Sequence, residues 1–155
     1  MSEIPRLATA ADAGTVARLL DKFNREFDTP SPGPDVLGGR LHTLLAGDQV
    51  LALLAGDPAI AVAVLTLRPN VWYDGPVALL DELYVAPSGR NSGTGTALLK
   101  LAEDEVRRRG AELLEINVDG ADVDARRFYE RHGYTNIDEG QDEPSFYYYR
   151  ELTER

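Results

Sequence analysis

A glycine-rich turn between an apolar strand and a helix is the part of this chain best suited to hold a ligand. The turn has the form Arg-x-x-Gly-x-Gly, with Arg90, Gly93 and Gly95 at the fixed positions. Glycine permits positive φ and lets the backbone approach a ligand closely. The N-terminus of a helix offers backbone N–H groups and the positive end of the helix dipole, so it favours a phosphate. Further side-chain donors in the turn are Asn91, Ser92, Thr94 and Thr96.

Two widespread phosphate-binding motifs do not match this turn. A P-loop needs Gly-Lys followed by Ser or Thr, and no such sequence follows at the required spacing. A dinucleotide-binding fingerprint needs a third glycine where Leu98 stands. Two interpretations remain: a donor-rich cradle for a pyrophosphate, or a strand–helix turn that binds nothing.

A second motif, Phe128-Tyr129-x-x-x-Gly133-Tyr134, lies on a predicted helix that Gly133 ends. The phenol of Tyr129 could donate a proton in a reaction, but that role needs a specific partner. Taken by itself, the motif is explained more simply by packing of the ring. Asp122 or Asp124 is expected to cap this helix.

Composition limits the class of protein. The chain has 155 residues, of which 43% are hydrophobic and 27% charged, and this suits a folded domain with a substantial core. It has no cysteine and only two histidines, which excludes disulfides, a cysteine nucleophile and a multi-histidine metal site, although not a carboxylate-rich one. The net charge of −10 disfavours nucleic acid and anionic membranes and favours cationic small molecules, or it only keeps the protein soluble.

No membrane or export segment is expected. No apolar run is long enough to span a bilayer. The N-terminal residues lack the basic and apolar regions of a secretory signal. The predicted location is therefore the cytoplasm.

Apolar periodicity and turn residues predict an α/β order of elements without repeats or a domain boundary, so residues 1–155 are expected to form one domain. A loop with three prolines covers 28–34, and another at 69–76 holds the only tryptophan, Trp72. The predicted helices cover 10–27, 35–46, 95–109 and the region from Asp122 or Asp124 to His132. The predicted strands cover 6–9, 50–55, 59–68, 77–85, 112–118, 134–137 and 146–152.

Together, in this order and at this separation, the two motifs resemble the GNAT superfamily of N-acetyltransferases, and the similarity covers nearly the whole chain. The resemblance implies an α/β fold, a single GNAT-like domain with a mixed central sheet of about six to seven strands flanked by about four helices. It implies that the turn binds the pyrophosphate of acetyl-CoA and that the backbone of the preceding strand pairs with its pantetheine arm. The cofactor-binding residues so implied are Leu83, Tyr84, Val85, Arg90, Asn91, Ser92, Gly93, Thr94, Gly95 and Thr96.

The resemblance also implies direct transfer of the acetyl group to a primary amine, with no metal required. Tyr129 would protonate the departing CoA thiolate, and Glu82 is the first candidate for the base that deprotonates the amine. In ideal pleating Asp81 lies on the opposite face, but family strands carry a bulge here, so the sequence does not decide which side chain faces the substrate. A salt bridge or a solvated edge explains Glu82 equally well. The same bulge would free a backbone N–H to polarise the thioester carbonyl.

One position departs from the family pattern. Many members carry asparagine where this chain has Asp122, and an aspartate accepts hydrogen bonds from amides but donates none. Asp122 could also serve only as the helix cap. Whether it contacts the cofactor therefore stays open.

The acceptor is expected at the variable loops, which combine aromatic and acidic residues as a cationic amine requires. These are residues 27–34, the loop with Trp72 and Tyr73, and residues 138–143 with Tyr147 to Tyr149. A small-molecule amine and a peptide are both possible acceptors. Two other functions stay open: an acyltransferase with a longer acyl donor or an O-acyl acceptor, and a GNAT-like module that binds acyl-CoA without turnover. The tyrosine-rich segment 146–152 could reach a second subunit of a homodimer or pack within its own sheet.

Overall fold

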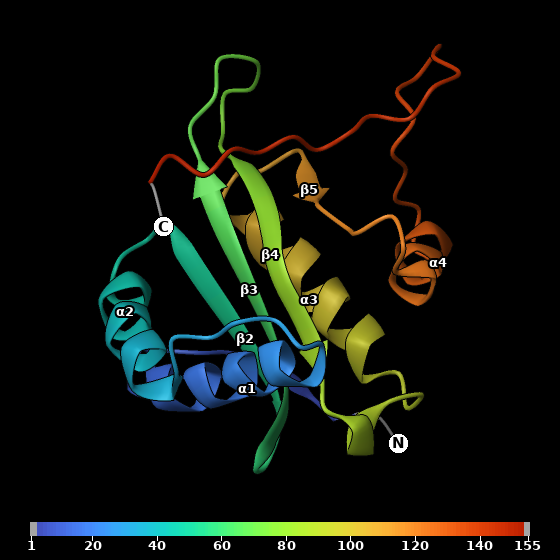
Figure 1. The fold of residues 1–155 in the computed structure, drawn as a ribbon. Coiled ribbons are helices and arrows are strands. Elements are labelled where there is room, and N and C mark those ends of the chain that lie inside the picture. Colours follow the sequence, from blue (N-terminus) through green and yellow to red (C-terminus); the bar gives the residue numbers. More distant parts are fainter. Residues whose placement is uncertain (1–2, 154–155) are drawn as a thin grey trace. The chain divides into compact units, whose positions relative to one another are not determined.

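The computed structural model describes residues 3–153, which fall into two compact units, an N-terminal unit that ends at Ile116 and a C-terminal unit that begins at Asn117. The N-terminal unit contains a five-stranded sheet in the order β1-β2-β3-β4-β5 (Figure 1). Neighbouring strands are antiparallel except β4 and β5, which are parallel. The strands are β1 (Pro5–Leu7), β2 (Val50–Gly56), β3 (Ala59–Arg68), β4 (Val77–Val85) and β5 (Leu114–Ile116).

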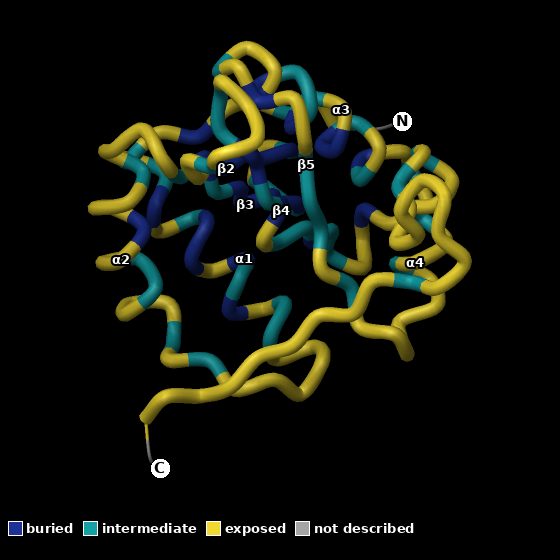
Figure 2. Tube along the Cα trace, turned by 90° about the horizontal axis from the view of Figure 1, so that it is seen from above, coloured by how far each residue is buried: buried dark blue, intermediate teal, exposed yellow. Residues whose placement is uncertain are grey.

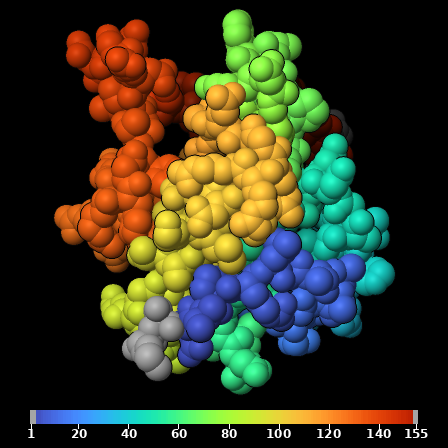
Figure 3. Space-filling view, turned by 180° about the vertical axis from the view of Figure 1, so that it is seen from behind, coloured from blue at the N-terminus to red at the C-terminus, as the bar shows by residue number. Residues whose placement is uncertain are grey.

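Helices cover both faces of this sheet (Figures 1 and 2). The helices α1 (Ala13–Glu26) and α2 (Pro34–Ala46) pack on one face, where Val16, Leu54 and Val62 belong to a single apolar cluster. The helix α3 (Thr94–Arg108) covers the other face with Leu98, Leu99 and Ala102, and it fills the centre of the view from behind (Figure 3). Because both faces are covered, β2 and β3 are apolar almost throughout rather than alternating.

Local signals account for most of these boundaries. Two 3₁₀ turns, η1 (Ala10–Asp12) and η2 (Pro87–Gly89), precede α1 and α3. Thr9 is the N-cap of η1, and its N–H donates to Asp12 Oδ2 at 2.8 Å. A short turn between the two predicted strands joins β2 to β3 as an antiparallel hairpin. No helix within residues 3–153 is long and apolar enough to cross a membrane.

The C-terminal unit contains the helix α4 (Val123–Arg131) and extended chain. The strands predicted at 134–137 and 146–152 do not form there, so the described sheet has five strands instead of six to seven. The strand predicted at 112–118 is likewise reduced to the three residues of β5. The reason is that alternation records only which side chains could share a face, whereas a strand also needs a hydrogen-bonded neighbour. That residues 1–155 form one domain stays a prediction.

Candidate functional site

A β-bulge interrupts β4 at its two acidic residues. Glu82 pairs with Val64 of β3, but Leu80 pairs with Leu65, so Asp81 is an extra residue between the two pairs. A bulge places two residues of one strand opposite one residue of its neighbour. The bulge expected in this strand is therefore present.

The bulge turns both carboxylates to the same face of the sheet. Residues paired across two strands share a face, so Glu82 lies on the face of Val64, which belongs to the cluster under α1 and α2. Asp81 accepts a hydrogen bond from Thr66 Oγ1, and Thr66 lies two residues from Val64 on that same face. In a regular strand the two carboxylates would point to opposite faces. The register shift therefore brings two adjacent acidic side chains together on one surface.

Both carboxyl groups bind protons more tightly than usual. Partial burial raises the pKa of Glu82, and repulsion from Asp81 raises it further. Partial desolvation also raises the pKa of Asp81, while the hydrogen bond from Thr66 opposes that change. A carboxylate with a raised pKa is a better proton acceptor from an ammonium group near neutral pH.

Beyond the bulge, β4 presents backbone groups to an edge that no strand of its own sheet covers. β5 pairs with β4 only along residues 78–80. The N–H of Ala86 donates to the carbonyl of Ile60 at 2.8 Å, which fixes the alternation of the ladder. By that alternation Leu83 and Val85 direct their N–H and C=O groups away from β3. An extended ligand can add to such an edge by main-chain hydrogen bonds.

Tyr84 is placed differently from its two neighbours. Its backbone groups are directed toward β3, and its side chain is only 4% exposed. Of the three strand residues predicted to contact the cofactor, Leu83 and Val85 therefore present their backbone to the open edge, and Tyr84 does not.

The glycine-rich turn follows η2 and leads directly into α3. Gly93 is the N-cap of α3 and has a φ of 84°, a left-handed conformation that glycine adopts without strain. The bond from Ala97 N to Gly93 O, 3.0 Å long, begins the helical pattern. The N–H groups of the residues before Ala97 consequently point out of the helix end, where the dipole favours an anion.

Two hydroxyls of the turn stabilise the turn itself. Ser92 Oγ donates to Gly89 O at 2.5 Å and lies 3.0 Å from Thr94 Oγ1. Thr94 is only 1% exposed. Because Ser92 uses its single hydroxyl proton on Gly89, this hydroxyl has no proton to donate to a ligand.

Arg90 is held by two bonds at the start of the turn. Its Nε donates to Val85 O at 2.9 Å, and its Nη2 donates to Glu26 Oε2 at 2.6 Å. The predicted cationic donor is therefore present, but its charge is paired with the last residue of α1. No sequence pattern marked Glu26, because 64 residues separate it from Arg90 and only the packing of α1 beside β4 joins them.

The second motif forms the helix of the C-terminal unit. Asp122 Oδ1 accepts a hydrogen bond from Ala125 N at 3.1 Å, which confirms the predicted cap. Gly133 has a φ of 90° and ends the helix as expected. The ring of Tyr129 is half-buried and makes an edge contact with the ring of Tyr134 at a centroid distance of 5.9 Å. The proton-donor role of Tyr129, and any contact of Asp122 with a cofactor, stay predictions.

The aromatic residues predicted to meet the acceptor are mostly exposed. In the loop between β3 and β4, Trp72 is 85% exposed, and the N–H groups of Trp72 and Tyr73 both donate to Asn70 Oδ1 at 2.8 Å. In the C-terminal unit, Tyr147 stacks on Tyr149 with a centroid distance of 5.9 Å.

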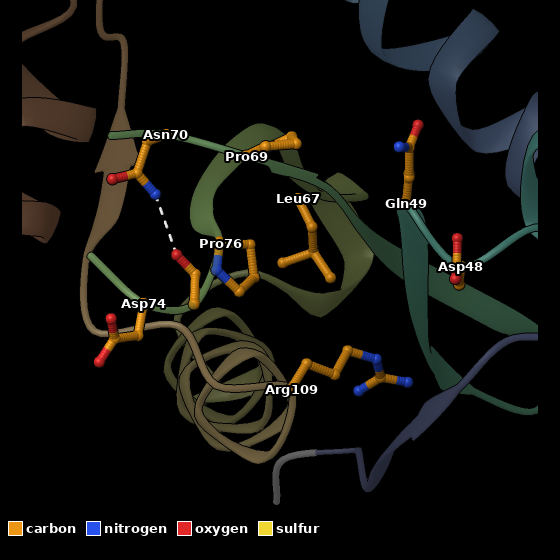
Figure 4. Close-up of a pocket in the computed structure, with 9 residues that line it drawn as sticks. Asp48, Gln49, Leu67, Pro69, Asn70, Asp74, Pro76 and Arg109 are labelled. Carbon is orange, nitrogen blue, oxygen red and sulfur yellow. Dashed lines mark hydrogen bonds between the residues drawn. The ribbon is translucent and has the colours of Figure 1, made fainter. Parts of the chain in front are cut away.

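A pocket of about 540 Å³ lies in the N-terminal unit, where β3 and α3 end (Figure 4). Its lining includes Asp48, Leu67, Asn70 and Arg109, and Asn70 Nδ2 donates to Gly75 O at 2.9 Å. The predicted catalytic and cofactor-binding residues do not line this pocket, whereas the loop around Trp72, at which the acceptor was expected, contributes Pro69, Asn70, Asp74, Gly75 and Pro76. Within residues 3–153, no group of three or more His, Asp or Glu side chains is arranged to hold a metal ion.

Comparison with known proteins identifies the family of this chain. The sequence matches the model of the acetyltransferase (GNAT) family over residues 16–134. The chain belongs to the GNAT acetyltransferase family. The predicted fold class and the predicted class of enzyme, an N-acetyltransferase, are thereby confirmed.

Individual relatives of this GNAT acetyltransferase differ in how much of it they match. The crystal structure of a candidate acetyltransferase from Arthrobacter sp. FB24 is 59% identical and superimposes with a TM-score of 0.92, covering 97% of this chain and 96% of that chain. The aminoalkylphosphonate N-acetyltransferase of Salmonella typhimurium is 36% identical over 84 residues, 54% of each chain. The aminoglycoside N(6')-acetyltransferase type 1 of Klebsiella aerogenes is 41% identical over 63 residues, 39% of this chain and 41% of the relative. The match thus spans about half or less of these two relatives.

Proposed function

We propose that this GNAT acetyltransferase transfers an acetyl group from acetyl-CoA to the primary amine of a small, cationic molecule or of a peptide. The observation that carries the proposal is the bulge of β4, which sets Glu82 and Asp81 on one face. The open edge of Leu83 and Val85 follows directly, and the cradle before α3 comes next in the chain. One continuous segment therefore carries a base, a strand edge and an anion site.

The residues of the N-terminal unit fit acetyl-CoA. A pyrophosphate suits the N-terminus of α3 beyond Gly93, where N–H groups and the helix dipole converge. The amides of the pantetheine arm suit the backbone groups of Leu83 and the N–H of Val85, by the pairing that adds a strand to a sheet edge, while the carbonyl of Val85 already accepts from Arg90 Nε. When bound, acetyl-CoA supplies an activated thioester as the acetyl donor.

Side chains of this protein would accept and donate the protons that the reaction moves. Glu82, with its raised pKa, would accept a proton from the ammonium form of the acceptor, directly or through water. Asp81, on the same face, would attract that ammonium by charge. Tyr129 would donate a proton to the departing thiolate, a role that rests on the resemblance of its motif.

The acceptor class rests on charge and on the names of two relatives. A pair of neighbouring carboxylates favours a cation over a neutral or acidic acceptor. The relatives named above act, by name, on an aminoalkylphosphonate and on aminoglycosides, which are amines. From the charge of the two carboxylates, we expect small polyamines and aminosugars to be better acceptors than acidic amino acids.

The proposal is tested by calorimetric titration with CoA, followed by turnover of acetyl-CoA with polyamines, aminoglycosides, aminoalkylphosphonates, amino acids and peptide N-termini. Tyr129→Phe is expected to keep CoA affinity and to lower kcat by about 100-fold, which is the smaller end of what general acid–base catalysis contributes. Absence of CoA binding would overturn the proposal. Binding without turnover of any amine would favour the acyl-CoA-binding module instead.

Three further predictions from the sequence remain as predictions. They are the cytoplasmic location, the homodimer and the absence of nucleic-acid and membrane partners. A longer acyl donor or an O-acyl acceptor is distinguished by repeating the turnover assay with an acyl-CoA series and with alcohols.

A further inference from the structure

The last residue of α1, Glu26, has a hydrogen bond on each of its two carboxylate oxygens. Oε1 accepts from the hydroxyl of Tyr84 at 2.9 Å, and Oε2 accepts from Arg90 Nη2 at 2.6 Å. A carboxylate at the C-terminal end of a helix opposes the helix dipole, so its presence there has to be offset by such partners. The bond from Arg90, joined by that from Tyr84, holds the pKa of Glu26 below its ordinary value, which keeps the carboxylate charged.

The partners of Glu26 are themselves held in place. The ring of Tyr84 is almost fully buried and stacks on Phe23 of α1, with a centroid distance of 4.9 Å and an interplanar angle of 17°. Glu26 therefore sits on a rigid support formed by α1 and β4. A side chain fixed in this way can in turn fix the group that it binds.

Arg90 is bound from two directions and still has unused donors. A guanidinium has five N–H groups. In the described part of the chain, the bonds to Val85 and Glu26 use two of them, one on Nε and one on Nη2, and three remain. Because the two bonds come from the end of β4 and the end of α1, they fix the plane of the guanidinium three residues before Gly93.

We propose that Glu26 is a positioning residue, which holds Arg90 at the start of the glycine-rich turn so that its remaining donors meet the diphosphate of CoA. The inference rests on the proposed function, since it assigns the diphosphate to this turn. An arginine that is already ordered loses less side-chain entropy when the ligand binds. Without Glu26, the side chain of Arg90 would have to become ordered when CoA binds, and this loss of entropy would weaken CoA binding.

The experiment compares two acetyl donors, acetyl-CoA and S-acetyl-pantetheine, which lacks the diphosphate. Glu26→Ala is expected to lower kcat/KM for acetyl-CoA about fivefold, the worth of one partly exposed ion pair, and to leave kcat/KM for S-acetyl-pantetheine unchanged. Glu26→Gln, which keeps the shape and a hydrogen-bond acceptor, is expected to lie between the wild type and Glu26→Ala. The matched control is Glu115→Ala, which removes a carboxylate paired with Arg68 at the same distance of 2.6 Å but away from the turn.

A double-mutant cycle completes the test. In an Arg90→Ala background, Glu26→Ala is expected to have no further effect on the Kd of CoA. Equal losses with both donors would show that Glu26 only supports the fold through Tyr84, and tighter CoA binding by Glu26→Gln would show that it repels the phosphates; either result overturns the inference. A wild-type protein that does not bind CoA would overturn the proposed function instead, and the inference with it.

Discussion

Gly93 and Gly95 allow a test in which stability and ligand binding respond differently. Gly93 is left-handed, with φ and ψ of 84° and 2°, whereas Gly95 is the second residue of α3. Alanine at position 93 forces an L-residue into the left-handed region, at a cost of roughly 1–2 kcal/mol. Alanine at position 95 improves helix propensity by up to about 1 kcal/mol.

These energies translate into opposite shifts of the melting temperature. For a chain of 155 residues, a change of 1 kcal/mol moves Tm by roughly 2–4 °C. Gly93→Ala is therefore expected to lower Tm by roughly 2–8 °C, and Gly95→Ala to raise it by up to about 4 °C. Differential scanning calorimetry without ligand measures both shifts.

Ligand binding is expected to follow the shape of the turn, not its stability. Alanine at position 95 adds a single methyl group and keeps the helical backbone, so Gly95→Ala should change the Kd of CoA by less than about threefold. Gly95→Val keeps a helical residue but places two methyl groups beside the N–H groups that would face the pyrophosphate. Loss of one charge-assisted hydrogen bond raises the Kd by roughly 10- to 100-fold.

The control for Gly95→Val is Gly39→Val in α2, another helical glycine, whose side-chain position opens into free space. Titration calorimetry with CoA is expected to show wild-type affinity for this control. A folded Gly95→Val protein that binds CoA as tightly as the wild type would refute the assignment of the pyrophosphate to the N-terminus of α3.

Three other expectations follow from the described contacts. Glu82→Gln should lower kcat/KM by at least about 100-fold. Because burial and Asp81 raise the pKa of Glu82, the activity of the wild type should begin to fall on acidification at a higher pH than an ordinary glutamate would give. Asp81→Asn should move this acidic limb of the pH–rate profile to lower pH. An ion pair and a backbone N–H hold the pKa of Asp12 at about 2, below its unfolded value, so its stabilising contribution is complete above about pH 5 and is lost as the pH falls through 2. Asp12→Asn should therefore cost about 1 kcal/mol in urea unfolding at neutral pH, and progressively less as the pH falls through 2. Gly75→Ala should cost roughly 1–3 kcal/mol, because a Cβ there would lie 2.1 Å from a backbone carbonyl oxygen of the loop after α3, and an unchanged urea midpoint would contradict this packing.

Most elements of the fold were predictable because their signals are local. The bounds of β3 and β4 match the prediction. The bounds of α2 and α3 differ from the prediction by one residue at three of their four ends. Each lies between strong turn residues, such as the glycine and proline that separate β2 from β3. The prediction of the two last strands was wrong. Their apolar alternation is a local signal, but a strand also needs a hydrogen-bonded neighbouring strand, and a local signal does not show whether one is present.

The candidate site was predictable in its residue types but not in its geometry. The positive φ of Gly93 and the cap at Asp122 follow from residue type and position alone. Two features of the site depend on contacts that form only in the folded chain. The hydroxyl of Ser92 donates to the turn itself, and the side chain of Tyr84 is buried.

The sequence by itself determined the family, the order of the elements and the segment in which strand, turn and helix follow one another, because short-range propensity and motif spacing encode all three. Only the tertiary structure decided that Asp81 and Glu82 share a face: the resemblance predicted a bulge in this strand, but the direction of each side chain depends on how the two strands pair. The same holds for Arg90, whose partner Glu26 lies 64 residues away and reaches it only when α1 packs beside β4. The residues able to do chemistry can thus be identified from the sequence, whereas the directions of their side chains and their partners depend on how the sheet and helices pack.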